Sequence, residues 1–214
     1  MPILDITNRT ENWKTAVYFS PLFNGNGARL AERLGEFPKP QSGGVNLELF
    51  WRGMRDFLYR TRVKKQSAQQ EYADLYVRLF PNLRRNIEEF GEFHKLQPDN
   101  YDVSNKNRMV NLANNLANTE IDVVLETPNH LFIGEAKHEM SFGGNGDLVL
   151  VHQLIRQYVM AEILIEFSNK RKAVIPFVVC DKVESVMKTS QVHFMIEQGW
   201  LKEENVLGWD EIKA

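Results

Sequence analysis

The chain lacks the features that define several classes of protein. It has a single cysteine, Cys180, so neither an internal disulfide nor a cysteine-based zinc site can form. This residue ends the apolar run Val178-Val179-Cys180, where a buried small side chain is expected. No apolar stretch is long enough to cross a bilayer, and the first residues lack the charged and apolar regions of a signal peptide. We therefore expect a cytoplasmic protein with no membrane partner.

An excess of basic residues is also missing. Lys and Arg number 26 against 28 Asp and Glu, which gives a formal net charge of −2. A nucleic-acid partner would therefore need a local concentration of positive charge. The apolar content of 43% and the charged content of 25% are ordinary for a globular protein. A length of 214 residues suffices for one large domain, or for one domain with an extension.

The chain does contain two apolar, β-branched runs on either side of a Thr-Pro-Asn-His turn. The first, residues 121–125, includes Asp122, and the second, residues 131–137, ends in Glu-Ala-Lys. Runs separated by a Pro-Asn turn predict a β-hairpin. Residues two apart on a strand share a face, so we expect Glu135 and Lys137 to point the same way. Asp122 joins them if the hairpin pairs in register.

Two carboxylates and a lysine at the end of a buried sheet indicate a chemical role. Ionised carboxylates repel each other and are costly to bury unpaired, and Mg²⁺ removes this repulsion while keeping waters for substrate phosphates. We expect Asp122 and Glu135 to bind Mg²⁺ or Mn²⁺, with the backbone carbonyl of Ala136 as a further ligand. Lys137 then orients the attacking water, assists its deprotonation or offsets transition-state charge. The alternative is an ordinary ion pair between Glu135 and Lys137 on a half-exposed strand, with Asp122 solvated.

The pattern of Asp122 followed by Glu135-Ala136-Lys137 resembles the Asp…(Asp/Glu)-x-Lys signature of the PD-(D/E)XK nuclease superfamily. That superfamily includes restriction endonucleases, Holliday junction resolvases and repair nucleases. The proline of the signature is absent, because Glu120-Ile121 precede Asp122. The resemblance, which covers roughly residues 105–210, implies a metal-dependent nuclease that hydrolyses phosphodiester bonds, with DNA favoured over RNA. The alternatives are an inactive nuclease-fold domain that binds nucleic acid or a protein partner, and a metal-free structural domain of an assembly.

The resemblance also implies roles for residues around the motif. In many members the helix after the Glu-x-Lys strand carries polar side chains that hold the lysine, a water or a phosphate. On the helix expected at residues 148–167, Gln153 is the first such candidate and Gln157 the second, and the alternative is a solvent-facing helix surface. Members also commonly supply another acidic residue from a preceding helix. The acidic residues considered for this role are Glu48, which is preferred, and Glu71, Glu88 and Glu89.

A basic segment provides the positive charge that the whole chain lacks. Apolar residues recur at helical spacing between residues 46 and 60, which predicts an amphipathic helix. Its other side and the residues after it carry the densest group of basic side chains: Arg52, Arg55, Arg60, Arg62, Lys64 and Lys65. This group either binds phosphates through its charge or is a solvated surface, and the sequence does not favour one over the other.

The remaining patterns predict the fold. The other expected elements are a strand at 15–19, helices at 28–34, 72–79, 83–90, 105–118 and 191–198, and strands at 173–180 and 206–209. A glycine-rich loop is expected at 141–147, and Pro176 favours an edge or a bulge for its strand. The order hairpin, helix, strand, helix, strand predicts an α/β fold with a mixed central sheet flanked by helices, as in restriction endonuclease-like proteins.

The same order predicts the domain organisation. We expect a mostly helical N-terminal extension, residues 1–104, packed on or inserted in an α/β core of residues 105–214, with the two forming one compact unit. The oligomeric state is left open, with a homodimer as one option.

Overall fold

The computed structural model describes residues 10–24, 27–38, 40, 44–61, 118–138 and 153–212 of the chain. The chain divides into two compact units. Unit 1 comprises Met1–Trp51, Ile121–Phe142 and Arg171–Ala214, and unit 2 comprises Arg52–Glu120 and Gly143–Lys170. The helices expected at 72–79, 83–90 and 105–118 and the loop expected at 141–147 lie outside the described residues.

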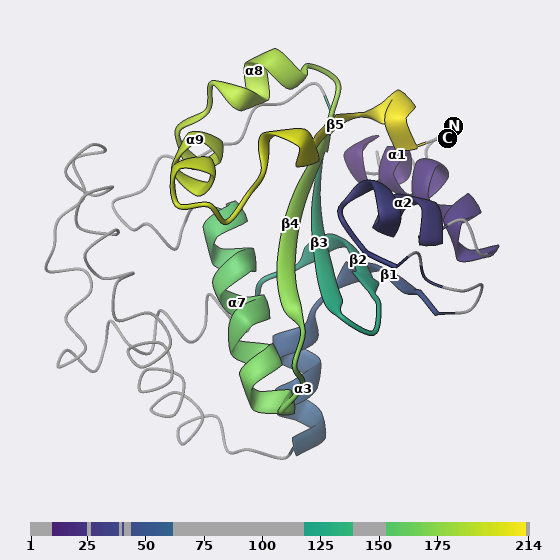
Figure 1. The fold of residues 1–214 in the computed structure, drawn as a ribbon, viewed down its shortest axis with the longest axis vertical. Coiled ribbons are helices and arrows are strands. Elements are labelled where there is room, and N and C mark those ends of the chain that lie inside the picture. Colours follow the sequence, from purple (N-terminus) through teal and green to yellow (C-terminus); the bar gives the residue numbers. More distant parts are fainter. Residues whose placement is uncertain are drawn as a thin grey trace, which may run out of the picture. The chain divides into compact units, whose positions relative to one another are not determined.

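Unit 1 is built on a mixed sheet of five strands in the order β1-β2-β3-β4-β5 (Figure 1). The strands are β1 (Asn46–Trp51), β2 (Ile121–Glu126), β3 (His130–Lys137), β4 (Ala173–Cys180) and β5 (Val206–Gly208). β1, β2 and β3 pair antiparallel, whereas β3, β4 and β5 run parallel. The expected hairpin is therefore confirmed as β2 and β3, and so is an α/β fold with a mixed sheet flanked by helices.

Helices and short 3₁₀ segments complete the described chain. Unit 1 contains α1 (Thr10–Phe19), η1 (Ser20–Asn24), α2 (Gly27–Arg33), α8 (Val183–Met187), α9 (Ser190–Glu197), η4 (Glu203–Asn205) and η5 (Trp209–Ile212). Unit 2 contains α3 (Gly53–Thr61) and α7 (Gln153–Ser168), which contact each other. Within unit 1, α1 packs on β2 and β3, and α8 contacts β5. No helix among the described residues is both long and apolar enough to span a membrane.

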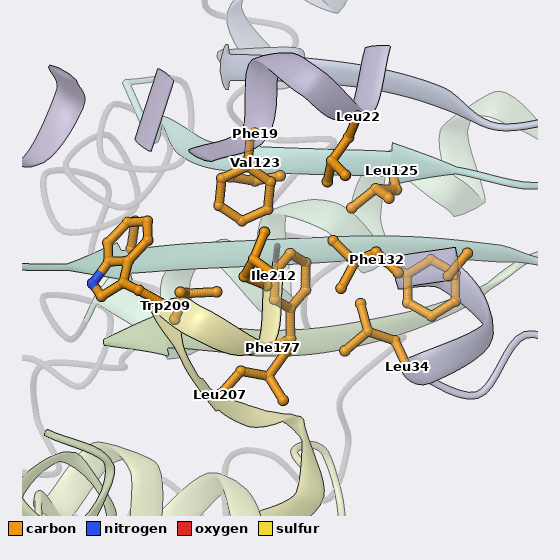
Figure 2. Packing of buried hydrophobic residues seen from close by; sticks show 14 residues of the cluster. Phe19, Leu22, Leu34, Val123, Leu125, Phe132, Phe177, Leu207, Trp209 and Ile212 are labelled. Carbon is orange, nitrogen blue, oxygen red and sulfur yellow. The ribbon is translucent and has the colours of Figure 1, made fainter. Parts of the chain in front are cut away.

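The main apolar core lies on one face of the sheet, the core face. Its strand residues alternate along each strand, as side chains on a single face must: Val123, Leu125, Phe132, Ala136, Phe177, Val179 and Leu207. Phe19, Leu22 and Leu34, which precede β1, belong to the same buried cluster as Phe132 and Phe177 of the strands (Figure 2). The intervening strand residues point to the opposite face, the site face, which carries Asp122, Glu135 and Lys137.

Gly134 marks a close approach inside this core. A Cβ added to Gly134 would lie 2.2 Å from Cζ of Phe177, far inside van der Waals contact. A glycine within a strand often marks the close approach of another group. That group is the Phe177 ring on the core face, so Gly134 serves the packing of the core.

The strand expected at residues 15–19 is wrong, because these residues end helix α1. Thr15 and Phe19 are fully buried whereas Trp13 and Val17 are exposed, a spacing that places one side of a helix on the core. The short β-branched and aromatic run had favoured a strand, but packing on the sheet selects the helix.

The helix expected at residues 46–60 is wrong in its first half. Residues 46–51 form β1, and the helix α3 begins only at Gly53. Leu47 and Leu49 pack against the core whereas Asn46 and Glu48 are exposed, which is the alternation of a strand. The apolar residues of this segment fit both periods, and antiparallel pairing with β2 selects the strand.

Pro176 lies in an internal strand, although the sequence suggested an edge or a bulge. Pro176 pairs with Ile133 of β3, but the pairing of β4 with β5 begins only at Val178. On its β5 side, the carbonyl of Pro176 accepts a hydrogen bond from the Asn205 side chain (3.4 Å). The missing N–H of the proline therefore interrupts no ladder, because in the described part of the chain β4 has no strand neighbour on its β5 side at Pro176.

The other helices and strands expected within the described residues are confirmed. Helix α2 is followed by Gly35 with φ of 106°, and α9 by Gly199 with φ of 69°, the left-handed geometry of a helix end. The strands β4 and β5 and the helix α7 lie where the sequence predicts them, and Cys180 is buried.

Candidate active site

The register of the hairpin brings the predicted motif residues to one place. Val123 pairs with Gly134, so Asp122 lies opposite Glu135 one step further along the two strands. Residues opposite each other in an antiparallel pair have side chains on the same face. Asp122, Glu135 and Lys137 therefore share the site face, at the end of β3 where parallel pairing with β4 also ends.

Glu135 and Lys137 form a buried ion pair. The Nζ of Lys137 lies 2.5 Å from Oε1 of Glu135. Glu135 is 1% exposed and Lys137 is 8% exposed. The half-exposed strand of the alternative interpretation is thus wrong, although the ion pair itself is present. Burying two charges costs several kcal/mol per ion before their attraction is counted, so such a pair is weak evidence for a role in stability.

Asp122 is bound to the other strand of the hairpin through its side chain. Its Oδ2 accepts a hydrogen bond from the backbone N–H of Ala136 (2.9 Å). The ladder between β2 and β3 reaches Val123 and Gly134, so this carboxylate binds the strand where the ladder has ended. The N–H and C=O of one strand residue point to the same edge. The carbonyl of Ala136 is therefore directed to the β2 side of β3, and its role as a metal ligand stays a prediction.

Cys180 is the cross-strand neighbour of Lys137 on β4. Burial raises the pKa of its thiol to about 11, and the Sγ–H faces the carbonyl of Leu207 (3.7 Å). Since the thiolate is the reactive form of cysteine, Cys180 stays neutral near pH 7. It is a buried, neutral side chain that supplies volume beside the lysine.

Glu48 lies on β1 and not on a helix. It pairs with Val124, which shares the site face with Asp122, and its side chain is exposed. It therefore stands on the same face as the motif, one strand further out. Among the residues that the structure describes, no three His, Cys, Asp or Glu side chains are grouped closely enough to hold a metal ion. A role for Glu48 as a ligand stays a prediction.

The remaining predicted site residues belong to unit 2. Gln157 is 2% exposed and donates a hydrogen bond from Nε2 to the carbonyl of Glu120 (2.9 Å), so it does not face solvent. Gln153 is the first residue of α7 and is partly exposed. A role for either glutamine beside Lys137 stays a prediction.

The basic group is described only in part. Arg52 is paired with Glu120 (2.6 Å), and Arg55 is paired with Asp56 (3.0 Å). Two of its charges are thus already opposed by carboxylates. The side chain of Arg60 and the residues Arg62 and Lys64 lie outside the described part of the chain.

The sequence did not reveal a second group of polar side chains around the end of β3. This strand-end cluster consists of Lys14, His138, Asp181 and Trp209. His138 and Asp181 directly follow parallel strands, whose carboxyl ends commonly carry functional residues. Their positions in the sequence could therefore have marked these two residues as candidates. Lys14 and Trp209 gave no local signal, because their contacts join residues far apart in the chain.

Comparisons of the chain with family models, with curated proteins and with solved structures find no match. The resemblance to PD-(D/E)XK nucleases therefore stands on the motif residues and on their geometry.

Proposed function

We propose that the chain is a metal-dependent nuclease of the PD-(D/E)XK type, which hydrolyses phosphodiester bonds, with DNA as the favoured substrate. One observation carries the proposal. A buried Glu135–Lys137 ion pair lies on the same face as Asp122, where the hairpin ladder ends. Two carboxylates grouped with a buried ammonium are typical of catalytic sites, and such a group contributes little to the stability of the fold.

The donor set fits a hard divalent cation. Mg²⁺ is usually bound through one or two carboxylates and keeps waters and substrate oxygens in its other positions. Asp122 and Glu135 would hold the cation, and the carbonyl of Ala136 would be the third ligand. When bound, the cation supplies Lewis acidity toward a phosphate oxygen and lowers the pKa of water. Without the cation, Asp122, Glu135 and Lys137 together carry one negative charge. With a bound divalent cation the site carries one positive charge, which attracts the negatively charged phosphodiester.

The protein side chains supply the rest of the chemistry. The Lys137 ammonium, held beside Glu135, offsets the negative charge that develops on the phosphate oxygens in the transition state. Its Nζ can also donate a hydrogen bond that orients the attacking water. The hydrogen bond from Ala136 N–H to Asp122 fixes the carboxylate before any ligand binds, so little reorganisation is needed on binding.

The test is a cleavage screen with supercoiled plasmid, linear duplex, single-stranded and branched DNA, and with RNA, in Mg²⁺, in Mn²⁺ and in chelator. Glu135→Gln is the control against a contaminating nuclease, because it removes the charge and keeps the shape of the side chain. We expect metal-dependent cleavage by the wild type and none by Glu135→Gln. No cleavage of any substrate, together with no metal binding by calorimetry, would refute the proposal in favour of an inactive nuclease fold.

A further inference from the structure

The strand-end cluster encloses the residue that follows Lys137. Nδ1 of His138 lies 2.7 Å from Oδ2 of Asp181, which directly follows β4. The Nζ of Lys14, on α1, lies 3.0 Å from the same ring nitrogen and also binds the Asp181 carboxylate. All three side chains are mostly sheltered, with exposures of 19% for Lys14, 28% for Asp181 and 19% for His138. Three titratable groups from separate elements thus converge at the end of β3.

Trp209 binds Lys137 itself, through the backbone. Its indole Nε1–H donates a hydrogen bond to the carbonyl of Lys137 (3.3 Å), and the residue is 5% exposed. The indole is in turn fixed by its neighbours. The Nζ of Lys14 lies 4.9 Å from its ring centroid, and the ring of Tyr18 packs at 4.9 Å. Figure 2 shows Trp209 at the margin of the apolar cluster, so the ring is set by the core and its N–H is directed at the strand.

The end of β3 needs this support, because its ordinary partners run out there. The ladder with β2 reaches Gly134, and Lys137 is the last residue that pairs with β4. A strand end that keeps a ladder on one side only is more prone to fraying, whereas a catalytic group must be held to about 0.5 Å. Trp209 and the His138–Asp181 pair bind this segment from the direction of the core.

We propose that Trp209 and Asp181 are positioning residues that hold Lys137 at its working place, an inference that rests on the proposed nuclease function. Trp209 acts through the backbone carbonyl of Lys137, and Asp181 acts through the side chain of the next residue, His138. If Trp209 and Asp181 only stabilised the fold, substituting them would lower the melting temperature without a selective fall in kcat relative to KM and metal affinity.

The experiment compares Trp209→Phe, which removes the N–H and keeps an aromatic ring, with Asp181→Asn, which removes the charge and keeps the shape. Trp200→Phe and Glu197→Gln are matched controls, since Trp200 packs on Phe194 and Glu197 lies on the exposed side of α9. We expect kcat to fall by about 10- to 100-fold in both test variants, with KM and metal affinity unchanged. The ¹⁵N order parameters of Lys137 and His138 should fall in the same variants.

The outcomes distinguish this inference from the proposed function. A folded Trp209→Phe or Asp181→Asn protein with wild-type kcat and unchanged order parameters overturns the positioning role, whatever the nuclease does. A wild-type protein that cleaves no substrate overturns the proposed nuclease function. The positioning role then falls with it, even if the order parameters of Lys137 and His138 change in the variants. A loss of melting temperature with no selective effect on kcat identifies the strand-end cluster as purely structural and also overturns the inference.

Discussion

The carboxylate of Asp122 on β2 accepts a hydrogen bond from the backbone N–H of Ala136 on β3, 2.9 Å away, where the ladder between the two strands has ended. One side chain therefore joins the two halves of the motif. The same carboxylate is the predicted ligand of a divalent cation. The hydrogen bond and the proposed binding of a cation are separate roles of Asp122, which two substitutions can distinguish.

Asp122→Asn keeps an oxygen that can accept from Ala136 and removes the charge. We expect nearly wild-type stability and a large loss of Mg²⁺ affinity, because a hard cation needs anionic ligands. Asp122→Ala should lose the hydrogen bond as well, and with it about 1–2 kcal/mol of unfolding free energy. Calorimetric metal titration and urea unfolding measure the two effects. Equal metal affinity in wild type and Asp122→Asn would remove Asp122 from the ligand set.

Gly134→Ala should destabilise the protein by about 1–3 kcal/mol, because the new methyl group overlaps the Phe177 ring. The double variant with Phe177→Leu should recover part of the loss. Gly208→Ala is the control, since a Cβ there would meet only the Glu211 carboxylate at 3.6 Å. Urea unfolding provides the comparison. Equal stability of Gly134→Ala and Gly208→Ala would contradict the packing described for the core.

The hairpin and the shared face of its charged residues were visible in the sequence because they are local. Alternation between Ile121 and Leu125 sets the strand and its faces, and spacing within the strand puts Glu135 and Lys137 on one side. Residues 46–51 could not be assigned in this way, because their apolar positions fit both a helix and a strand. Their conformation is decided by pairing with β2, which is remote in sequence.

The strand-end cluster was invisible for a related reason. The contact between Lys14 and Asp181 joins α1 to the residue after β4. A contact between residues so far apart in the chain cannot be predicted from local sequence patterns. Burial of the Glu135–Lys137 pair likewise depends on how the chain covers the site face. The sequence thus predicts which side chains share a face, and the fold decides how deeply they are buried and what supports them.

Glu36 should make the protein sensitive to acid. It is 3% exposed, and burial alone would raise its pKa. Hydrogen bonds from Thr127, His130 and Asn129, with the charge of His130, outweigh burial and lower the pKa from its usual 4.5. The unfolded chain then binds the proton more readily, so stability is present above about pH 4.5 and is lost as pH falls through the lowered value.

Glu36→Gln should therefore be less stable than the wild type at neutral pH and lose less stability on acidification. Urea unfolding between pH 7 and pH 3 measures the difference, with Glu204→Gln as a control at an exposed carboxylate. Parallel curves for wild type and Glu36→Gln below pH 4.5 would show that the proton linkage resides elsewhere.

The basic group should contribute unequally to DNA binding. Arg52 and Arg55 already face carboxylates, so replacing both by Gln should change the salt dependence of binding little. Replacing Arg62 and Lys64 should lower the slope of log affinity against log salt by about 1 unit for each phosphate that the protein no longer neutralises. Fluorescence anisotropy over a salt series measures the slopes. Unchanged slopes in both double variants would mean that DNA binds at another surface.

A paired measurement on Lys137→Ala, metal affinity by calorimetry and single-turnover cleavage, tests the proposed catalytic role of this lysine. Removing a positive charge beside the ligands should leave Mg²⁺ affinity unchanged or higher, whereas cleavage should fall by roughly 100-fold or more. Lys172→Ala is the matched control, because its side chain is similarly sheltered (12% exposed) and pairs with Glu126 near the opposite end of the sheet. It should change neither quantity. A Lys137→Ala protein that cleaves at the wild-type rate would contradict the central claim, since Lys137 would then be only half of a buried ion pair.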